Sequence, residues 1–208
     1  PDARFAARLS GKQVLTISRF DMTLTPRVAA AALALALITP SLQALEVGDK
    51  APPLGVGKWL AGKAEDPSRP DGKTTYVVEL WATWCPACRM SIPHLNKMQK
   101  RLAGKGVTFL GISPEEEKVV ADFLKTTPIR YSVGLDTNSA TLNAYKGAVD
   151  GIPRAFVIDK TGVVIWTGHP MDGLDRVLDR VAAGTFDPKL LAKTTQAETE
   201  LQAATQIA

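Results

Sequence analysis

The sequence predicts an α/β fold in which a mixed central β-sheet has helices on both faces. Two apolar, β-branched segments typical of buried strands are each followed by a segment with the three- and four-residue apolar spacing of an amphipathic helix. A predicted hairpin and one last helix then complete the domain. Strand–helix repeats give parallel strands and a hairpin gives antiparallel ones, so we expect a mixed sheet in one domain.

The first clear strand is Thr75–Trp81, because its run of β-branched, aromatic and other apolar residues is almost uninterrupted. Such a run is typical of a central strand that is buried on both faces. The preceding residues 45–74 are rich in Gly, Pro and Lys, and we expect them to contain at most short strands near Leu54–Leu60.

An amphipathic helix is predicted after Pro86. Pro93 lies inside it and is expected to kink it. Glycines at positions 104 and 106 end the pattern. The apolar positions recur at spacings of 4, 3, 3 and 4, and they are Cys88, Ile92, Leu95, Met98 and Leu102.

The second half of the domain repeats these signals. Val107–Ile112 predicts a second buried strand, and Ser113 followed by a proline and two glutamates predicts the N-cap and first turn of a helix to Lys125, which Pro128 ends. The later predicted elements are a short strand over Tyr131–Leu135, a short helix over Ser139–Tyr145, a hairpin of Ala155–Asp159 and Val163–Thr167, and a helix from Leu174 to Gly184.

Residues 1–44 predict a targeting leader. The chain begins with Pro1, and Met22 is a candidate translation start that is followed by a basic residue, the apolar run Val28–Ile38 and a small residue at Ala44. These are the marks of a secretory signal peptide, and the 11-residue run is shorter than the roughly 20 residues of a membrane-spanning helix. We expect export with cleavage near Ala44, and an uncleaved membrane anchor is the alternative.

The chain is therefore divided into a leader (residues 1–44), one α/β domain (residues 45–184) and a C-terminal tail (residues 185–208). The tail is rich in Ala, Thr, Gln and Glu, so we expect a peripheral helix or disorder.

The charge of the chain argues against nucleic-acid binding. The net charge is +4, but five basic and two acidic residues lie in residues 1–44. The rest of the chain then has 20 basic and 19 acidic residues, a net charge of +1. Without a basic surface, the electrostatic footprint of a nucleic-acid-binding protein is missing.

Cys85 and Cys88 are the only cysteines, and they lie where the predicted strand Thr75–Trp81 gives way to a helix. A thiol at the first turn of a helix faces unpaired backbone N–H groups and the positive end of the helix dipole, which stabilise a thiolate. A thiolate attacks disulfides, and a second cysteine one turn along can resolve the mixed disulfide. The pattern predicts Cys85 as the nucleophile and the more buried Cys88 as the resolving thiol.

Three other interpretations of this pair stay open. A structural disulfide would constrain the unfolded chain little across a two-residue loop. A zinc site needs four ligands, and besides the cysteines the chain has only His94 and His169 as nitrogen ligands, so we expect no metal. Two inert buried cysteines are disfavoured by the flanking Trp84 and Pro86 at a strand-to-helix junction.

These residues resemble the thioredoxin superfamily, and more closely the exported TlpA/ResA-type thiol-disulfide oxidoreductases, which are related to the redoxin (AhpC/TSA-like) group. The resemblance spans roughly residues 46–183 and implies a thioredoxin-like fold. It rests on the motif segments Glu79–Arg89 (ELWATWCPACR), Met90–Leu95 (MSIPHL), Gly111–Ser113 (GIS), Gly151–Pro153 (GIP) and Phe156–Asp159 (FVID).

By this resemblance Cys85 matches the attacking cysteine, Cys88 the resolving one, and Pro153 the cis-proline beside the disulfide. A proline before a strand cannot donate a ladder hydrogen bond, which leaves groups of Ile152 free to hold an extended substrate segment. We expect Ile152, Pro153, Trp84 and Pro86 to contact substrate, with Trp84 shielding the disulfide. A trans loop proline is the alternative for Pro153.

Glu79, six residues before Cys85, matches the buried acidic position of thioredoxins, where aspartate is more familiar. A lone carboxylate in an apolar strand is desolvated, which raises its pKa and suits it to proton transfer with Cys88. A surface-facing Glu79 is the alternative, because strand alternation could turn it outward. Arg89 could add positive charge near the cysteines or only solvate the helix, and His94 is expected to pack or face solvent.

The predicted function is thiol-disulfide exchange with protein thiols in the cell envelope, without a metal or organic cofactor. The resemblance implies that the partners are protein thiols or disulfides and an upstream redox protein, with a role in cytochrome c or envelope maturation as in the family that the chain resembles. A copper-binding assembly module and a peroxidase-like redoxin are the alternatives. Copper-delivery relatives usually have a longer cysteine spacing and a histidine, and the peroxidatic cysteine with a neighbouring Thr is missing. We expect a periplasmic or envelope-associated protein.

Overall fold

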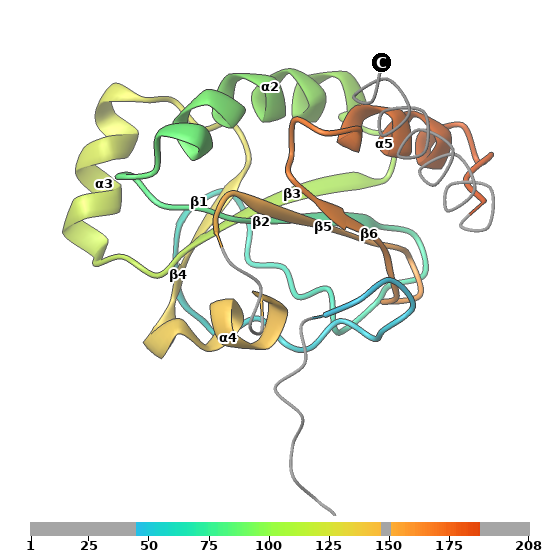
Figure 1. The fold of residues 1–208 in the computed structure, drawn as a ribbon, viewed down its shortest axis with the longest axis horizontal. Coiled ribbons are helices and arrows are strands. Elements are labelled where there is room, and N and C mark those ends of the chain that lie inside the picture. Colours follow the sequence, from blue (N-terminus) through green and yellow to red (C-terminus); the bar gives the residue numbers. More distant parts are fainter. Residues whose placement is uncertain (1–44, 147–150, 188–208) are drawn as a thin grey trace, which may run out of the picture. The chain divides into compact units, whose positions relative to one another are not determined.

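The structure, a computed structural model, describes residues 45–146 and 151–187 (Figure 1). The strands are β1 (Val56–Ala61), β2 (Thr75–Leu80), β3 (Val107–Ser113), β4 (Ser132–Asp136), β5 (Arg154–Ile158) and β6 (Val164–Gly168). The helices are α2 (Pro86–Leu102), α3 (Glu117–Thr126), α4 (Ala140–Lys146) and α5 (Leu174–Ala182), with a 3-10 turn η1 (Thr137–Ser139) before α4.

The strands form one sheet in the order β1-β4-β3-β2-β5-β6. β2 is parallel to β3, and β3 to β4, whereas β1, β5 and β6 run antiparallel to their neighbours. The mixed sheet and the hairpin that were predicted from the sequence are confirmed. β2 lies between β3 and β5, and all six of its residues are buried, as its almost uninterrupted apolar run indicated.

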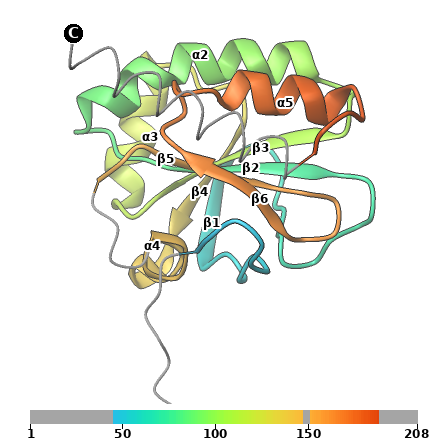
Figure 2. The same ribbon diagram turned by 45° about the vertical axis from the view of Figure 1, so that its right-hand side comes forward.

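Helices cover both faces of the sheet. α2 and α5 lie side by side on one face and α4 lies on the other (Figures 1 and 2). Val77 of β2 packs in the cluster that contains apolar residues of α2 and α5, whereas Tyr76 and Val78 pack in the cluster with Tyr145 of α4. Because side chains alternate along a strand, position 79 points toward α2 like Val77.

The start of α3 differs from its prediction. Ser113 does not cap this helix; it is the last residue of β3 and pairs with Leu135 of β4. α3 begins three residues later than expected, after Glu116, which makes no capping hydrogen bond with its side chain. The sheet ladder holds the Ser113 backbone in extended conformation, so the local capping preference is overridden by tertiary pairing.

The predicted leader, residues 1–44, and residues 188–208 of the predicted tail lie outside the described residues. Over residues 45–146 and 151–187, no helix is long and apolar enough to cross a membrane.

Candidate active site

A disulfide joins Cys85 and Cys88 at the N-terminus of α2, with their Cα atoms 5.2 Å apart. Cys85 is the N-cap residue, Pro86 occupies the first turn, and Cys88 follows one turn along. A proline suits the first turn because its missing N–H would have no helical partner there. β2 ends at Leu80, so the sheet delivers the sulfurs to the edge where its parallel strands end.

Backbone groups surround the outer sulfur. The Cys88 N–H donates to Cys85 Sγ at 3.1 Å, and the Ile152 carbonyl oxygen lies 3.5 Å from the same sulfur. An N–H group of the first helical turn directed at sulfur stabilises negative charge when the disulfide is opened.

The disulfide lies just below an exposed surface. Cys85 is 3% exposed and Cys88 0%, whereas the adjacent Trp84 is 68% exposed and Pro86 is also exposed. Most of the Trp84 ring therefore faces solvent, and of the two cysteines only Cys85 has accessible surface.

The Ile152–Pro153 peptide bond is cis, as the resemblance implied. Pro153 is buried and Ile152 half-buried, directly before β5. The structure thus brings the cysteine pair, Cys85 and Cys88, next to Ile152 and Pro153. Cys85 and Ile152 are 67 residues apart in the chain.

Glu79 is 1% exposed and faces α2, which excludes the surface-facing alternative. Its Oε1 accepts a hydrogen bond from the Ser91 hydroxyl and its Oε2 one from the Tyr131 hydroxyl, both at 2.9 Å. Burial raises the pKa of Glu79 to about 7, and the two hydrogen bonds act in the opposite direction. The Ser91 hydroxyl also lies 2.8 Å from the Cys88 carbonyl oxygen, so one side chain connects the acid to the backbone of the first turn of α2.

Gly111 explains how Tyr131 reaches Glu79 across an intervening strand. Gly111 of β3 is the register partner of Glu79. A Cβ atom at position 111 would lie 2.9 Å from the Tyr131 ring and 3.1 Å from the indole nitrogen of Trp81. The missing side chain therefore leaves the space in which Tyr131 crosses β3. Sequence reasoning missed Ser91, Tyr131 and Gly111, and a glycine inside a predicted buried strand was the one available signal.

A second missed contact fixes the loop before the disulfide. The backbone N–H and hydroxyl of Thr83 donate to the two carboxylate oxygens of Glu115, at 2.6 and 2.7 Å. The Ser113 hydroxyl donates to the same carboxylate at 3.1 Å. Glu115 thus ties the segment two residues before Cys85 to the connection between β3 and α3.

The hydrogen bonds of Glu79 in the described part of the chain do not include Trp81, Arg89 or His94. Trp81 is fully buried and packs against Phe123 of α3 at a ring distance of 5.6 Å, so it belongs to the core. Arg89 is exposed on α2, and His94 is half-buried on the same helix.

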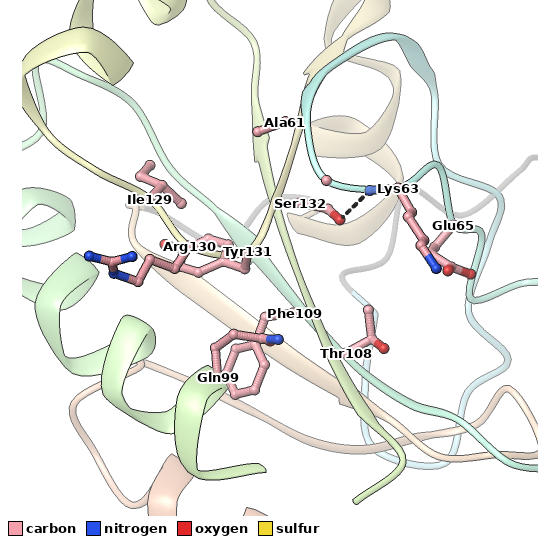
Figure 3. Close-up of a pocket in the computed structure, with 11 residues that line it drawn as sticks. Ala61, Lys63, Glu65, Gln99, Thr108, Phe109, Ile129, Arg130, Tyr131 and Ser132 are labelled. Atoms are coloured by element: carbon pink, nitrogen blue, oxygen red, sulfur yellow. Dashed lines mark hydrogen bonds between the residues drawn. The ribbon is translucent and has the colours of Figure 1, made fainter. Parts of the chain in front are cut away.

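A separate cavity of about 430 Å³ adjoins Tyr131 (Figure 3). Gln99 of α2 and Arg130 approach it, and Lys63 lies across from them beside Ser132, to whose hydroxyl the Lys63 backbone N–H donates. None of its lining residues is a cysteine or a neighbour of one, so the cavity is distinct from the disulfide.

Comparisons with known proteins agree with this geometry. A family model described as Redoxin matches residues 46–178. The thiol-disulfide oxidoreductase ResA of Bacillus subtilis is 30% identical over 50% of this chain and 57% of its own length. The thiol:disulfide interchange protein DsbE of Pseudomonas aeruginosa is 34% identical over 42% of this chain and 47% of its own.

A solved structure extends the similarity to the fold. The crystal structure of a thiol:disulfide interchange protein of the thioredoxin family from Chlorobium tepidum is 33% identical. It superposes with a TM-score of 0.53 over 67% of this chain and 99% of that one. The predicted thioredoxin-like fold is therefore confirmed. The chain spans about half the length of the two curated relatives.

Proposed function

Because the chain belongs to the redoxin family, we propose that it is a thiol-disulfide oxidoreductase that exchanges disulfides with proteins through Cys85 and Cys88. The observation that carries this proposal is the disulfide at the start of α2, with the Cys88 N–H directed at Cys85 Sγ. That geometry supplies a bond that can open and a thiolate that is stabilised once it does.

The exchange proceeds in two steps. In the reduced protein, the Cys85 thiolate attacks one sulfur of a substrate disulfide, and the other substrate sulfur leaves as a thiolate that takes a proton from water. Cys88 then loses its proton and attacks Cys85 Sγ, which forms the Cys85–Cys88 bond and breaks the mixed disulfide, and the second substrate sulfur leaves as a thiolate that takes a proton from water. The two cysteines are oxidised and the substrate disulfide is reduced. Both steps run in reverse when a partner is oxidised.

Glu79 acts as the proton acceptor and donor for Cys88. A carboxyl with a pKa of about 7 is present in both protonation states at neutral pH, which is what proton transfer in both directions needs. Its position beside the first turn of α2 supports this role, because Ser91 bonds its carboxylate and also contacts the backbone carbonyl of Cys88.

The substrate lies against the surface formed by Trp84, Pro86 and Ile152. Trp84 and Pro86 expose apolar surface beside the disulfide, and the half-buried Ile152 has its carbonyl next to Cys85. A polypeptide in extended conformation can contact both sides of the disulfide there. Pro153 holds the chain at this turn.

Proteins of the cell envelope are the proposed substrates, with a second thiol protein as the upstream redox partner. The signal-like segment after Met22 supports export to the periplasm or envelope, and the relatives' names support protein disulfides as substrates. The chemistry uses only the two sulfurs and an acid, so the proposal includes no metal or organic cofactor.

Trapping of a mixed disulfide tests this function. Reduced Cys88→Ser protein is expected to form a stable mixed disulfide with a model protein disulfide, whereas Cys85→Ser forms none and the wild type turns over. Stoichiometric Cu(I) binding without reductase activity would favour the copper alternative. Peroxide consumption that needs Cys85 alone would favour the peroxidase. Equilibration with glutathione then determines the direction of electron flow.

A further inference from the structure

The Ser91 hydroxyl has two acceptors and one proton. Its Oγ lies 2.9 Å from Glu79 Oε1 and 2.8 Å from the Cys88 carbonyl oxygen, and Ser91 is fully buried. Tyr131 donates to the other carboxylate oxygen of Glu79. Three oxygen–oxygen contacts therefore connect Cys88, Ser91, Glu79 and Tyr131, and each needs a proton to be a hydrogen bond.

The protons can be counted for each state of the acid. With Glu79 ionised, Ser91 and Tyr131 supply two protons, so Ser91 donates to the carboxylate and its contact with the Cys88 carbonyl has no proton. With Glu79 neutral, the carboxylic O–H donates to Ser91 Oγ, and Ser91 donates to the Cys88 carbonyl. All three contacts are then hydrogen bonds. The same hydroxyl serves both states only by reversing its direction.

We propose that Ser91 is a positioning residue whose hydroxyl reverses direction with the charge of Glu79 and thereby couples that acid to the first turn of α2. This inference rests on the proposed role of Glu79 in the reaction. When Cys88 passes its proton to Glu79 in the resolving step, Ser91 changes from donor to acceptor toward the acid and becomes a donor to the Cys88 backbone. Glu79 thus takes up the proton that the Cys88 thiol loses, and no buried oxygen of this network loses a hydrogen bond.

Within residues 45–146 and 151–187, no charged side chain is among the influences on the pKa of Glu79. Three influences set its pKa, and they are burial and the hydrogen bonds from Ser91 of α2 and Tyr131 of the segment before β4. On α2, the Cys88 carbonyl contacts the Ser91 hydroxyl that bonds Glu79. On the flanking strands its register partners are Gly111 of β3 and Ala155 of β5, neither of which titrates.

Removal of the Ser91 hydroxyl has a predictable sign. The hydrogen bond from Ser91 lowers the pKa of Glu79, so its loss in Ser91→Ala raises that pKa. The acid then needs a higher pH to accept the proton of Cys88. We expect the midpoint of the resolving step to rise by about one pH unit and its rate at pH 7 to fall about fivefold.

The experiment is a stopped-flow reaction of the reduced protein with 5,5′-dithiobis(2-nitrobenzoate) between pH 6 and 8.5. The first release of thionitrobenzoate reports attack by Cys85, and the second reports resolution by Cys88. Ser91→Thr keeps the hydroxyl and is expected to restore the wild-type midpoint. Ser132→Ala is the matched control, because its buried hydroxyl bonds the Lys63 backbone instead. In a Glu79→Gln background, Ser91→Ala is expected to cause no shift.

The outcomes separate the two proposals. A midpoint shift in Ser91→Ala, restored by Ser91→Thr and abolished with Glu79→Gln, supports the inference. A pH profile that Glu79→Gln flattens and Ser91→Ala leaves in place overturns the role of Ser91 alone, as does an equal shift in Ser132→Ala. A wild-type profile in Glu79→Gln overturns the role of Glu79 and with it that of Ser91. Absence of the first release overturns the proposed exchange function itself.

Discussion

The oxidised protein is expected to lose stability as the pH rises toward neutrality. Replacement of Glu79 by Gln is expected to remove this loss. Burial raises the pKa of Glu79 from 4.5 to about 7 in the folded protein. The folded chain therefore binds this proton more tightly than the unfolded chain, and the free energy of unfolding falls as the pH rises from 4.5 to 7. The stabilisation by the bound proton is complete below pH 4.5.

The size of the effect follows from the same shift. One pKa unit corresponds to about 1.36 kcal/mol, so the full change amounts to about 3 kcal/mol. Gln has the shape of the neutral acid: its carbonyl accepts from Tyr131, and its amide donates to Ser91. The two proteins should thus be similar at pH 5, and Glu79→Gln should be more stable by about 3 kcal/mol at pH 8.

Urea unfolding of both oxidised proteins at pH 5, 6, 7 and 8 measures this difference. Asp71 and Asp122 do not interfere, because hydrogen bonds to their carboxylates lower their pKa values to about 2, below the range tested. Glu116→Gln, at an exposed position, is the control for the loss of a carboxyl group outside the core. A stability difference between Glu79→Gln and the wild type that stays constant with pH would refute the reasoning.

Three further outcomes are expected. Iodoacetamide at pH 7 should modify Cys85 of the reduced protein well before Cys88, as read by mass spectrometry after digestion; equal rates would contradict stabilisation of the thiolate by the helix end. Gly111→Ala should destabilise the oxidised protein by about 1–3 kcal/mol in urea, since the new Cβ overlaps the Tyr131 ring, and an unchanged midpoint would show that the ring moves freely. Glu115→Gln should lower the free energy of unfolding by about 1–2 kcal/mol, because its hydrogen bonds to Thr83 are weaker. An unchanged Tm in thermal unfolding would show that this contact does not stabilise the fold.

The order of strands and helices could be predicted because each element has a strong local signal. Thr75–Trp81 is too apolar to be anything but buried, and the segment around Gly162 has turn chemistry that only a hairpin explains. Local signals fail where two of them compete. Ser113 is a residue type favoured at helix N-caps, and it also follows a predicted strand. In the structure it pairs with Leu135 of β4 and therefore belongs to the strand.

The site could be predicted where its functional residues lie close together in the sequence or differ clearly from their neighbours. The cysteines form a motif, and Glu79 stands out as a lone charge in an apolar strand. Ser91 and Tyr131 carry no such mark, because they lie 12 and 52 residues from the carboxyl that they bond. Their contacts depend on the helix phase of α2 and on the strand register that sets Gly111 beside Glu79, and a single sequence does not specify either.

The hydroxyl partners of Glu79 also explain why an acid can work at this position. A lysine or arginine beside it would hold the carboxylate ionised, and it would then give no proton back to Cys88. An apolar pocket without donors would hold it neutral, and it would then accept none. Burial raises the pKa while the hydroxyls of Ser91 and Tyr131 lower it, and the balance lies at about 7. Two uncharged donors thus leave the acid able to move a proton in either direction near neutral pH, which exchange chemistry in both directions requires.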